Sequence, residues 1–140
     1  MKWIISDSPD VFYNLALEEF LCKKINKENC FILWINEDSV IVGRNQNIFE
    51  EVNVDEAIAD GITLARRNSG GGTVFHDRGN INFSMIRDFN PDASDQYEEF
   101  LTPVIEMLRS LGIPAYKRNK SDIAIMDNKI SGNAQMIKNK

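Results

Sequence analysis

The sequence has 140 residues, of which 43% are hydrophobic and 26% charged, and its formal net charge is −5. This length suits one globular domain with its own core, and the composition excludes a disordered or fibrous chain. The negative charge argues against general binding of nucleic acid, which requires a basic surface to neutralise phosphates.

The termini and the cysteines indicate a cytoplasmic location. The first ten residues lack the apolar stretch of a signal peptide, and no segment approaches the roughly 20 apolar residues of a membrane span. Cys22 and Cys30 do not form a CxxC pair, and the single histidine, His76, cannot build an HExxH zinc site. We therefore expect reduced thiols in a cytosolic protein that makes no contact with membranes.

The first half of the chain is expected to contain four strands. They are the apolar and β-branched segments 2–6, 31–36, 39–43 and 62–67. Glu37 and Asp38 suit a turn, so the second and third of these strands are predicted to pair as a hairpin.

Two helices are expected between these strands. Ser8 can cap the first, with Pro9 at its first position and an apolar period that continues to Ile25. A short second helix is predicted to begin at Asn53 or Asp55 and to end before Gly61.

The second half continues the alternation of strands and helices. Strands are expected at 73–75 and 80–88, joined by a turn at 77–79. A helix with apolar positions from Tyr97 to Leu111 should be closed by Gly112, and Pro103 should bend it or mark its effective start. Residues 122–135 are predicted to form a hairpin around Asp127 and Asn128.

These elements indicate an α+β fold, with a mixed, largely antiparallel sheet and flanking helices, in a single domain over residues 1–140. Neither GxGxxG before a helix nor GxxxxGK[ST] occurs, so both the Rossmann and the P-loop fingerprints are absent.

The segment RRNSGGGTVFHD, residues 66–77, is the most unusual motif. Three consecutive glycines are entropically costly in a folded domain and need a reason. A tight turn between strands with solvated arginines is the simpler explanation. We favour an anion site, in which backbone N–H groups of residues 69–72 and one arginine bind phosphate or carboxylate. Arg66 and Arg67 should point to opposite faces of their strand, so only one need enter the site.

Two further motifs carry polar groups close to strands. VGRNQN, residues 42–47, places amide and guanidinium groups after an apolar strand, and KISGNAQ, residues 129–135, combines Lys129 with Gly132 in a strand pattern. Such a glycine often marks a bulge or the close approach of a ligand. Taken alone, these motifs would be an ordinary polar loop and a solvated lysine.

Together the three motifs, in this order and at these separations, resemble the lipoate-protein ligase A family over about residues 3–135. The resemblance implies a biotin/lipoate ligase-like (class II synthetase-like) fold. Catalytic domains of that family are considerably longer, so we expect this chain to be a truncated, N-terminal portion of one.

The resemblance implies a lipoate-protein ligase that works in two steps. ATP and lipoate first give lipoyl-AMP and pyrophosphate. A lysine of an acceptor lipoyl domain, from a 2-oxoacid dehydrogenase complex or the glycine cleavage H protein, then takes the lipoyl group. Lys129 would be catalytic, lying between the reacting carboxylate and the α-phosphate, where positive charge is needed.

The resemblance also implies the binding residues. Arg67 and the glycines would contact lipoyl-AMP, the strand from Val74 would face adenine, Asn45 and Gln46 would border the lipoate tunnel, and Asp122 would lie near the phosphates with Mg²⁺. The full set implied for lipoyl-AMP or ATP is Arg67, Ser69, Gly70, Gly71, Gly72, Val74, Phe75, His76, Asn80, Asp122, Gly132, Asn45 and Gln46. His76 is interpreted as an orienting or packing residue rather than a general base.

Two alternatives stay open at this point. Octanoyl or lipoyl transferases share the fold, and some use a cysteine nucleophile, although neither Cys22 nor Cys30 matches a nucleophile position. The other alternative is a catalytically incomplete ligand-binding fragment, with its exposed truncated face paired in a homo-oligomer.

Overall fold

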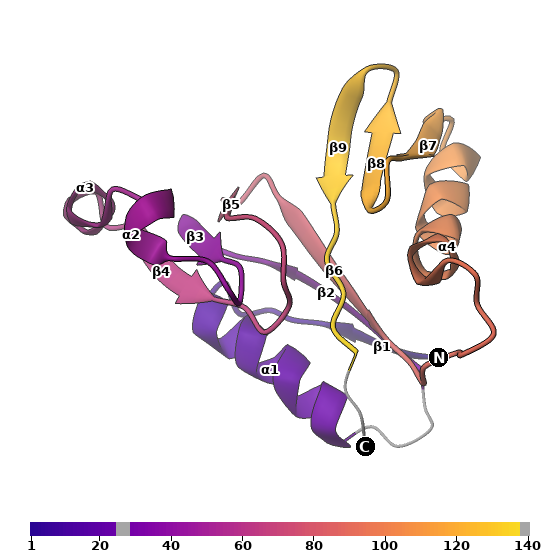
Figure 1. Ribbon diagram of the computed structural model, residues 1–140, viewed down its shortest axis with the longest axis horizontal. Coiled ribbons are helices and arrows are strands. Elements are labelled where there is room, and N and C mark those ends of the chain that lie inside the picture. The colour runs from indigo at the N-terminus through magenta and orange to yellow at the C-terminus, as the bar shows by residue number, and fades with distance from the viewer. Residues whose placement is uncertain (25–28, 138–140) are drawn as a thin grey trace. The chain divides into compact units, whose positions relative to one another are not determined.

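The computed structural model describes residues 1–24 and 29–137, which form two compact units, Met1–Asp88 and Phe89–Lys140 (Figure 1). The first unit contains β1 (Lys2–Ile5), α1 (Val11–Lys24), β2 (Cys30–Ile35), β3 (Ser39–Val42), α2 (Ile48–Glu51), α3 (Val54–Ala59), β4 (Thr63–Arg66), β5 (Val74–His76) and β6 (Ile81–Ile86). The second contains α4 (Gln96–Ser110), β7 (Ala115–Arg118), β8 (Asp122–Ile125) and β9 (Asn128–Gly132). The predicted α+β class is confirmed, and the single domain over residues 1–140 stays a prediction.

The strands form three small sheets with the orders β1-β2-β6, β4-β3-β5 and β7-β8-β9. β1 with β2 and β3 with β4 are parallel, whereas β2 with β6, β3 with β5, β7 with β8 and β8 with β9 are antiparallel. Among the described strands, pairing is therefore mixed and largely antiparallel, as predicted.

The predicted hairpin of β2 and β3 is wrong, because these strands belong to different sheets. The connection between them is held by contacts outside a hairpin turn. The backbone N–H of Glu37 donates to the Pro9 carbonyl (3.0 Å), and the buried Asn36 side chain bonds to Asn14 and His76. These bonds direct the chain from one sheet to the next.

Helix α1 begins at Val11, later than predicted, because Asp10 rather than Ser8 is its cap. The Asp10 carboxylate accepts hydrogen bonds from the backbone N–H groups of Phe12 (2.7 Å) and Tyr13 (3.3 Å). A carboxylate at this position satisfies amides that have no partner within the helix. Ile25, the last residue of the predicted period, lies outside the described residues.

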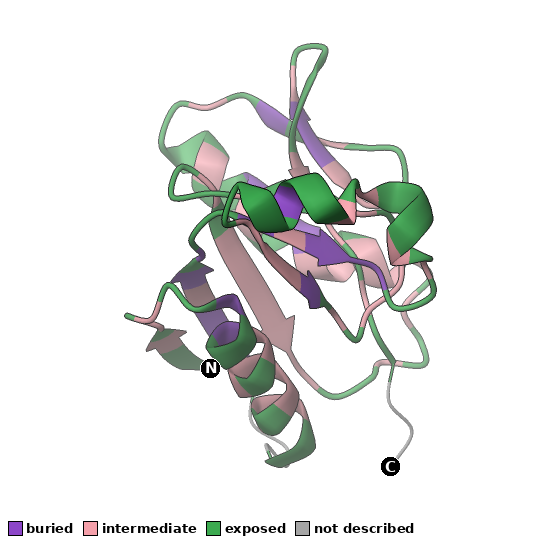
Figure 2. Ribbon diagram, turned by 90° about the vertical axis from the view of Figure 1, so that its left-hand side faces the viewer, coloured by how far each residue is buried: buried purple, intermediate pink, exposed green. Residues whose placement is uncertain are grey.

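Helix α1 covers both sheets of the first unit. Its Leu17 and Leu21 pack against the buried Cys30, Ile32 and Trp34 of β2. At its N-terminal end, the buried residues Val11, Ile41 and Ala65 form a second cluster. Figure 2 shows this burial on α1 and the strands beside it. The strands that precede the glycine motif are thus anchored on the core.

The short helices agree in part with the prediction. Asn53 caps α3, accepting from the Glu56 amide, and Gly61 follows with φ of 73°, which suits glycine. Helix α2 was not predicted, since four residues carry too little periodicity. Asn47 caps it through a hydrogen bond from the Phe49 amide.

In the second unit, α4 is followed by the β7-β8-β9 sheet. The buried residues of this unit lie on α4, β7 and β8, and are Leu101, Ile105, Ala115, Ile123 and Ala124. Gly112 follows α4 with φ of 81°, as expected for a closing glycine. Pro103 lies inside α4, so of the two alternatives predicted for it, that it marks the start of the helix is wrong, and that it bends the helix stays a prediction. Asp95 caps the helix. β8 and β9 form the predicted hairpin, with a register shift at Ile123 and Ala124. β7 was not predicted as a strand.

Candidate active site

The glycine motif forms a loop between β4 and β5, and the two arginines that precede it hold different loops. Nη1 of Arg66 donates to the carbonyl oxygens of Gly43 (2.8 Å), Arg44 (3.3 Å) and Gln46 (2.7 Å). The loop at residues 43–46 is therefore fixed by Arg66, which agrees with the expectation that the arginines diverge.

Arg67 fixes the glycine loop itself. Its Nη2 donates to the carbonyls of Gly70 (2.8 Å) and Gly72 (2.7 Å), its Nε to Ser69 Oγ (3.2 Å) and its Nη1 to the Ile41 carbonyl (3.1 Å). A guanidinium has five N–H donors, so within the described part of the chain these four bonds leave one N–H, on Nη1, without an acceptor. The carbonyls of Gly70 and Gly72 thus point at the guanidinium, and the positive charge of Arg67 lies against the glycine loop.

The three glycines differ in what requires them. Gly71 has φ of 95°, a conformation that other residues rarely adopt. At Gly70 and Gly72 a Cβ would meet nothing within 4 Å, so the protein's own packing does not require glycine there. Within residues 1–24 and 29–137, no group accepts a hydrogen bond from the N–H of Gly70, Gly71 or Gly72. The loop thus presents bare backbone and available donors to open space.

Gly43 is a site residue that sequence reasoning missed. A Cβ at this buried position would lie 2.0 Å from the Gly71 carbonyl oxygen, closer than any real contact. The Arg44 amide also donates to the Ser69 carbonyl (3.0 Å). The loop at residues 43–46 and the glycine loop therefore lie directly against each other. The only signal in the sequence was the presence of Gly43 within the motif VGRNQN.

Of the two amides expected to border a lipoate tunnel, Gln46 takes part in the loop contact. Its Oε1 accepts from the Gly43 amide (3.1 Å) and from Thr73 Oγ (2.8 Å), joining the start of one loop to the end of the other. Asn45 is exposed next to it.

Strand β5 supplies the predicted adenine-facing residues. It pairs with β3 through His76 opposite Ser39 and Val74 opposite Ile41, and it is an edge strand of its sheet as described. Val74 and Phe75 are 42% and 51% exposed, so apolar side chains and one row of backbone groups are accessible here. Asn80 lies after the turn, where its Nδ2 donates to Asn82 Oδ1 (2.9 Å).

His76 is held by a buried chain of amides. Its Nδ1 lies 3.1 Å from Nδ2 of Asn36, and Asn36 Oδ1 accepts from Nδ2 of Asn14 (2.9 Å). Both asparagines are almost fully buried. Burial lowers the pKa of His76, and the nearby Arg67 lowers it further, while Asp77 opposes this shift. His76 is therefore neutral at pH 7.

Glu18 of α1 brings a carboxylate near Arg67. Burial raises the pKa of Glu18, against a hydrogen bond from Ser84 Oγ and the charge of Arg67, both of which lower it. Desolvation also lowers the pKa of Arg67. The guanidinium of Arg67 nevertheless stays charged at pH 7, because the ordinary pKa of arginine lies far above that pH.

Lys129 forms a cluster within the second unit. Its Nζ lies 2.9 Å from Oδ1 of Asp122, on the neighbouring strand, and its side chain is 55% exposed. A Cβ at Gly132 would come within 2.9 Å of both Cε and Nζ of Lys129. The group that lies closest to Gly132 is thus the protein's own lysine side chain, and the approach of a ligand there stays a prediction. The structure brings Lys129, Asp122 and Gly132 together in this unit, and the glycine loop, Gln46 and Gly43 together in the first.

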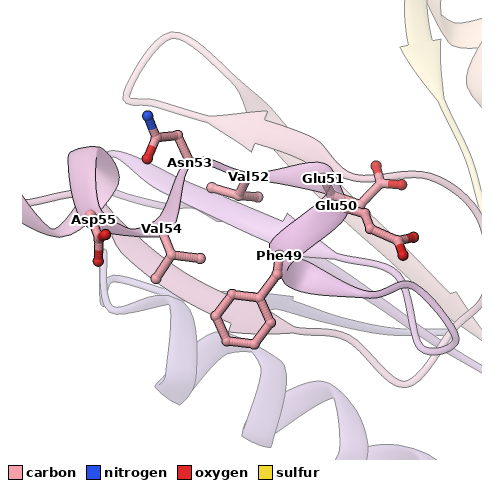
Figure 3. A pocket seen from close by; sticks show the side chains of 7 residues that line it. All are labelled: Phe49, Glu50, Glu51, Val52, Asn53, Val54 and Asp55. Carbon is pink, nitrogen blue, oxygen red and sulfur yellow. The ribbon is translucent and has the colours of Figure 1, made fainter.

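A surface pocket of about 480 Å³ lies elsewhere in the first unit, lined by residues 49–55 of α2 and α3. Figure 3 shows the carboxylates of Glu50 and Glu51 at one end and that of Asp55 at the other. None of the predicted site residues lines it. Three carboxylates would repel a phosphate, so this pocket is unsuited to a nucleotide.

Two other kinds of feature are not found in the described part of the chain. Residues 1–24 and 29–137 contain no three His, Cys, Asp or Glu side chains placed so that they could hold one metal ion together. No helix described here combines the length and apolar character required to span a bilayer.

Comparison with known proteins identifies the family of this chain. The family model described as the lipoyl protein ligase A/B catalytic domain matches residues 10–140. Lipoate–protein ligase 1 of Staphylococcus aureus is 42% identical over 143 residues, covering 100% of this chain and 44% of the relative. Lipoate-protein ligase LplJ of Bacillus subtilis is 43% identical over 123 residues, covering 87% and 37%. The chain spans less than half the length of both relatives.

Solved structures match over 98% of this chain. P. falciparum LipL1 in complex with lipoate has a TM-score of 0.84 and 32% identity, with 44% of that chain covered. A lipoate-protein ligase A bound with ATP has a TM-score of 0.88 and 29% identity, with 61% covered. A bipartite lipoate protein ligase from Thermoplasma acidophilum, studied with its E2 lipoyl domain, has a TM-score of 0.91 and 30% identity, with 56% covered. By fold, motifs and sequence, the chain belongs to the lipoyl protein ligase A/B catalytic domain family.

Proposed function

We propose that this chain carries the activating site of a lipoate-protein ligase, which joins lipoate to ATP and passes the lipoyl group to a protein lysine. The observation that carries the proposal is the glycine loop. Gly70 and Gly72 face open space without a packing reason for glycine, their N–H groups are available, and Arg67 lies beneath them. Such a loop suits a phosphate that lies on bare backbone.

In the first step, a carboxylate oxygen of lipoate attacks the α-phosphorus of ATP. A phosphorus–oxygen bond forms to give lipoyl-AMP, the bond to the β-phosphate breaks, and pyrophosphate leaves with the electron pair. Two anions must approach each other, so catalysis requires positive charge and directed N–H donors at the reacting centre. Arg67 and the loop amides supply these for the phosphate.

Lys129 is assigned to the reacting oxygens. Its ammonium is bound to Asp122 here, and its exposure lets it exchange this partner for the lipoate carboxylate and the α-phosphate. The bare Cα of Gly132 gives the side chain room along β9. A compact ammonium with three donors can contact both anions at once.

Asp122 would provide one carboxylate oxygen for Mg²⁺ with ATP. Mg²⁺ at nucleotide sites takes one or two carboxylates together with phosphate oxygens and water. A single half-buried carboxylate, Asp122, fits that donor set. When bound, the ion would offset the charge of the phosphates.

In the second step, the amine of an acceptor lysine attacks the lipoyl carbonyl, an amide forms, a proton leaves the nitrogen and AMP departs. We propose lipoyl domains, including E2 domains of 2-oxoacid dehydrogenase complexes, or the glycine cleavage H protein as acceptors. The structure of the Thermoplasma acidophilum ligase with its E2 lipoyl domain supports this choice. We propose the cytoplasm as the location of the reaction.

The alternative of acyl transfer through a cysteine is less well supported. Cys30 is fully buried, and burial raises the pKa of its thiol, against the opposing charge of Lys2. A buried, protonated thiol is a poor nucleophile. Cys22 lies on helix α1 rather than at the glycine loop.

The ligase and transferase proposals are separated by their acyl donors. The chain is incubated with an apo lipoyl domain and either ATP, Mg²⁺ and lipoate, or octanoyl acyl carrier protein without ATP. Pyrophosphate release and the intact mass of the lipoyl domain are measured. We expect pyrophosphate only with ATP and lipoate. The ligase assignment would be refuted if the lipoyl domain were octanoylated by the carrier protein without ATP and if no pyrophosphate were released in the reaction with ATP and lipoate.

A further inference from the structure

The hydrogen bonds that link the side-chain amides of Asn14 and Asn36 to His76 can have only one donor-to-acceptor direction. The backbone carbonyl of Ser8 can only accept, so the Asn14 group 2.8 Å from it must be Nδ2. The other Asn14 atom, Oδ1, accepts from Ser6 Oγ (2.6 Å). Asn14 Nδ2 also donates to Asn36, which must present its Oδ1 there. Asn36 is left with Nδ2 toward the imidazole.

This direction determines the tautomer of His76. Asn36 Nδ2 is a donor 3.1 Å from His76 Nδ1, so Nδ1 must carry a lone pair, and the single proton of a neutral imidazole is on Nε2. Protonation of Nδ1 would set two donors against each other at a side chain that is 1% exposed. The charged groups near the ring, Arg67 and Asp77, act in opposite directions, and the neutral form prevails.

Among the residues that the structure describes, the imidazole of His76 has a hydrogen-bond partner at Nδ1 and none at Nε2. β5 also carries the exposed Val74 and Phe75 and leads directly from the glycine loop. His76 is therefore one fixed, uncharged donor at the end of that surface.

We propose that Asn36 is a positioning residue that holds His76 in the neutral Nε2–H form, so that His76 donates a hydrogen bond to an acceptor atom of the nucleotide bound at the glycine loop. The donor role rests on the proposed function, whereas the tautomer does not. An imidazole fixed in this way offers the same donor at neutral and alkaline pH, without charge that would change the binding of phosphates.

The first measurement needs no ligand. Because the sequence has one histidine, labelling with ¹⁵N-histidine gives a single imidazole whose two nitrogens report the tautomer directly. We expect a protonated Nε2 and a bare Nδ1 at pH 7. An Nδ1–H tautomer, or an imidazolium at that pH, would overturn the proposal.

The decisive variant is Asn36→Asp, which keeps the shape of the side chain and the acceptor for Asn14. Its second oxygen can only accept, so it should draw the proton to Nδ1 and raise the pKa of His76 by roughly one to three units. Asn47→Asp, at the exposed cap of α2, adds the same charge and should leave the tautomer unchanged. An imidazole that titrates identically in all three proteins refutes the role of Asn36.

Titration with ATP and Mg²⁺ then tests the donor. The proposal requires the Nε2–H resonance to shift together with the amides of Gly70 and Gly72. Shifts of the glycine amides without any shift at Nε2 would overturn the donor role. If the glycine amides do not respond at all, the proposed function fails, and the ligand-free tautomer result is unaffected.

Discussion

At the scale of single residues, the site depends on two glycines that touch. Gly43 approaches the Gly71 carbonyl so closely that a Cβ would lie 2.0 Å from its oxygen, and the backbone at Gly71 has a positive φ of 95°. Neither constraint is visible in a motif, because one glycine ends a strand and the other belongs to a run of three.

Gly43→Ala should therefore destabilise the fold. The contact is with backbone that cannot rotate away, so the two loops must separate, at a cost of roughly 1–3 kcal/mol in the free energy of unfolding. Gly79→Ala is the matched control, because a Cβ there meets only the Asp77 side chain at 3.2 Å. Urea unfolding measures both variants. Equal stability of Gly43→Ala and wild type would contradict the close contact.

Lys129→Ala should remove lipoyl-AMP formation and leave the fold intact. The side chain is 55% exposed and contributes no buried packing. In the proposed function, its charge faces the reacting anions. We expect pyrophosphate release to fall by roughly 10²–10³-fold. Lys120→Ala removes an exposed lysine of the same unit and serves as the control. An undiminished rate in Lys129→Ala would exclude the lysine from the mechanism.

At the scale of elements, the beginning of α4 combines a cap with an ion pair. The Asp95 carboxylate accepts from the amides of Tyr97 (2.9 Å) and Glu98 (3.3 Å) and is bound by Lys117 of β7. The pKa of Asp95 is lowered, mainly by the hydrogen bond from Lys117. Desolvation raises it, and the amides of Glu98 and Tyr97 and the charge of Lys117 lower it further.

The lowered pKa of Asp95 makes the free energy of unfolding depend on pH. A carboxyl group whose pKa is lower in the folded state stabilises the fold above its unfolded pKa of about 3.9, and this contribution is lost as pH falls through the lower, folded value. Asp95→Asn keeps a cap acceptor without the charge, whereas Asp95→Ala removes both. We expect stability to decrease in the order wild type, Asn, Ala at pH 7, and the difference between wild type and Asn to shrink as the pH falls below about 3.9. Thermal melting as a function of pH checks this, and a difference that does not change with pH would argue against the ion pair.

The elements also show how far the sequence can be interpreted. Long periodic segments and capping glycines predicted α4, β8 and β9, and the glycine motif was correctly placed between two strands. The pairing of β2 with β3 was predicted wrongly, because loop length indicates a hairpin but the buried Asn36 ties the connection to Asn14 and His76. Contacts between residues this far apart leave no local pattern. For the same reason, Gly43 and Asn36 were not recognised as part of the site.

At the scale of the whole molecule, a protein of net charge −5 is proposed to bind a polyphosphate. Its general field opposes such a ligand, so affinity must come from local donors, and the candidates proposed above are the loop amides and Arg67 of the first unit and Lys129 of the second. Binding should consequently be localised at these residues and sensitive to single substitutions there.

The most direct test of this account is calorimetric titration of the chain with lipoyl-AMP, for wild type and Gly70→Val. The backbone at Gly70 has no positive φ and a Cβ meets nothing within 4 Å, so valine should be tolerated by the fold, as thermal melting will show. The account predicts saturable binding of one lipoyl-AMP by wild type and at least a tenfold loss of affinity in Gly70→Val, because the side chain fills the space of the ligand. Equal affinity in two equally stable proteins, or no binding by wild type, would contradict the assignment of the glycine loop as the adenylate site.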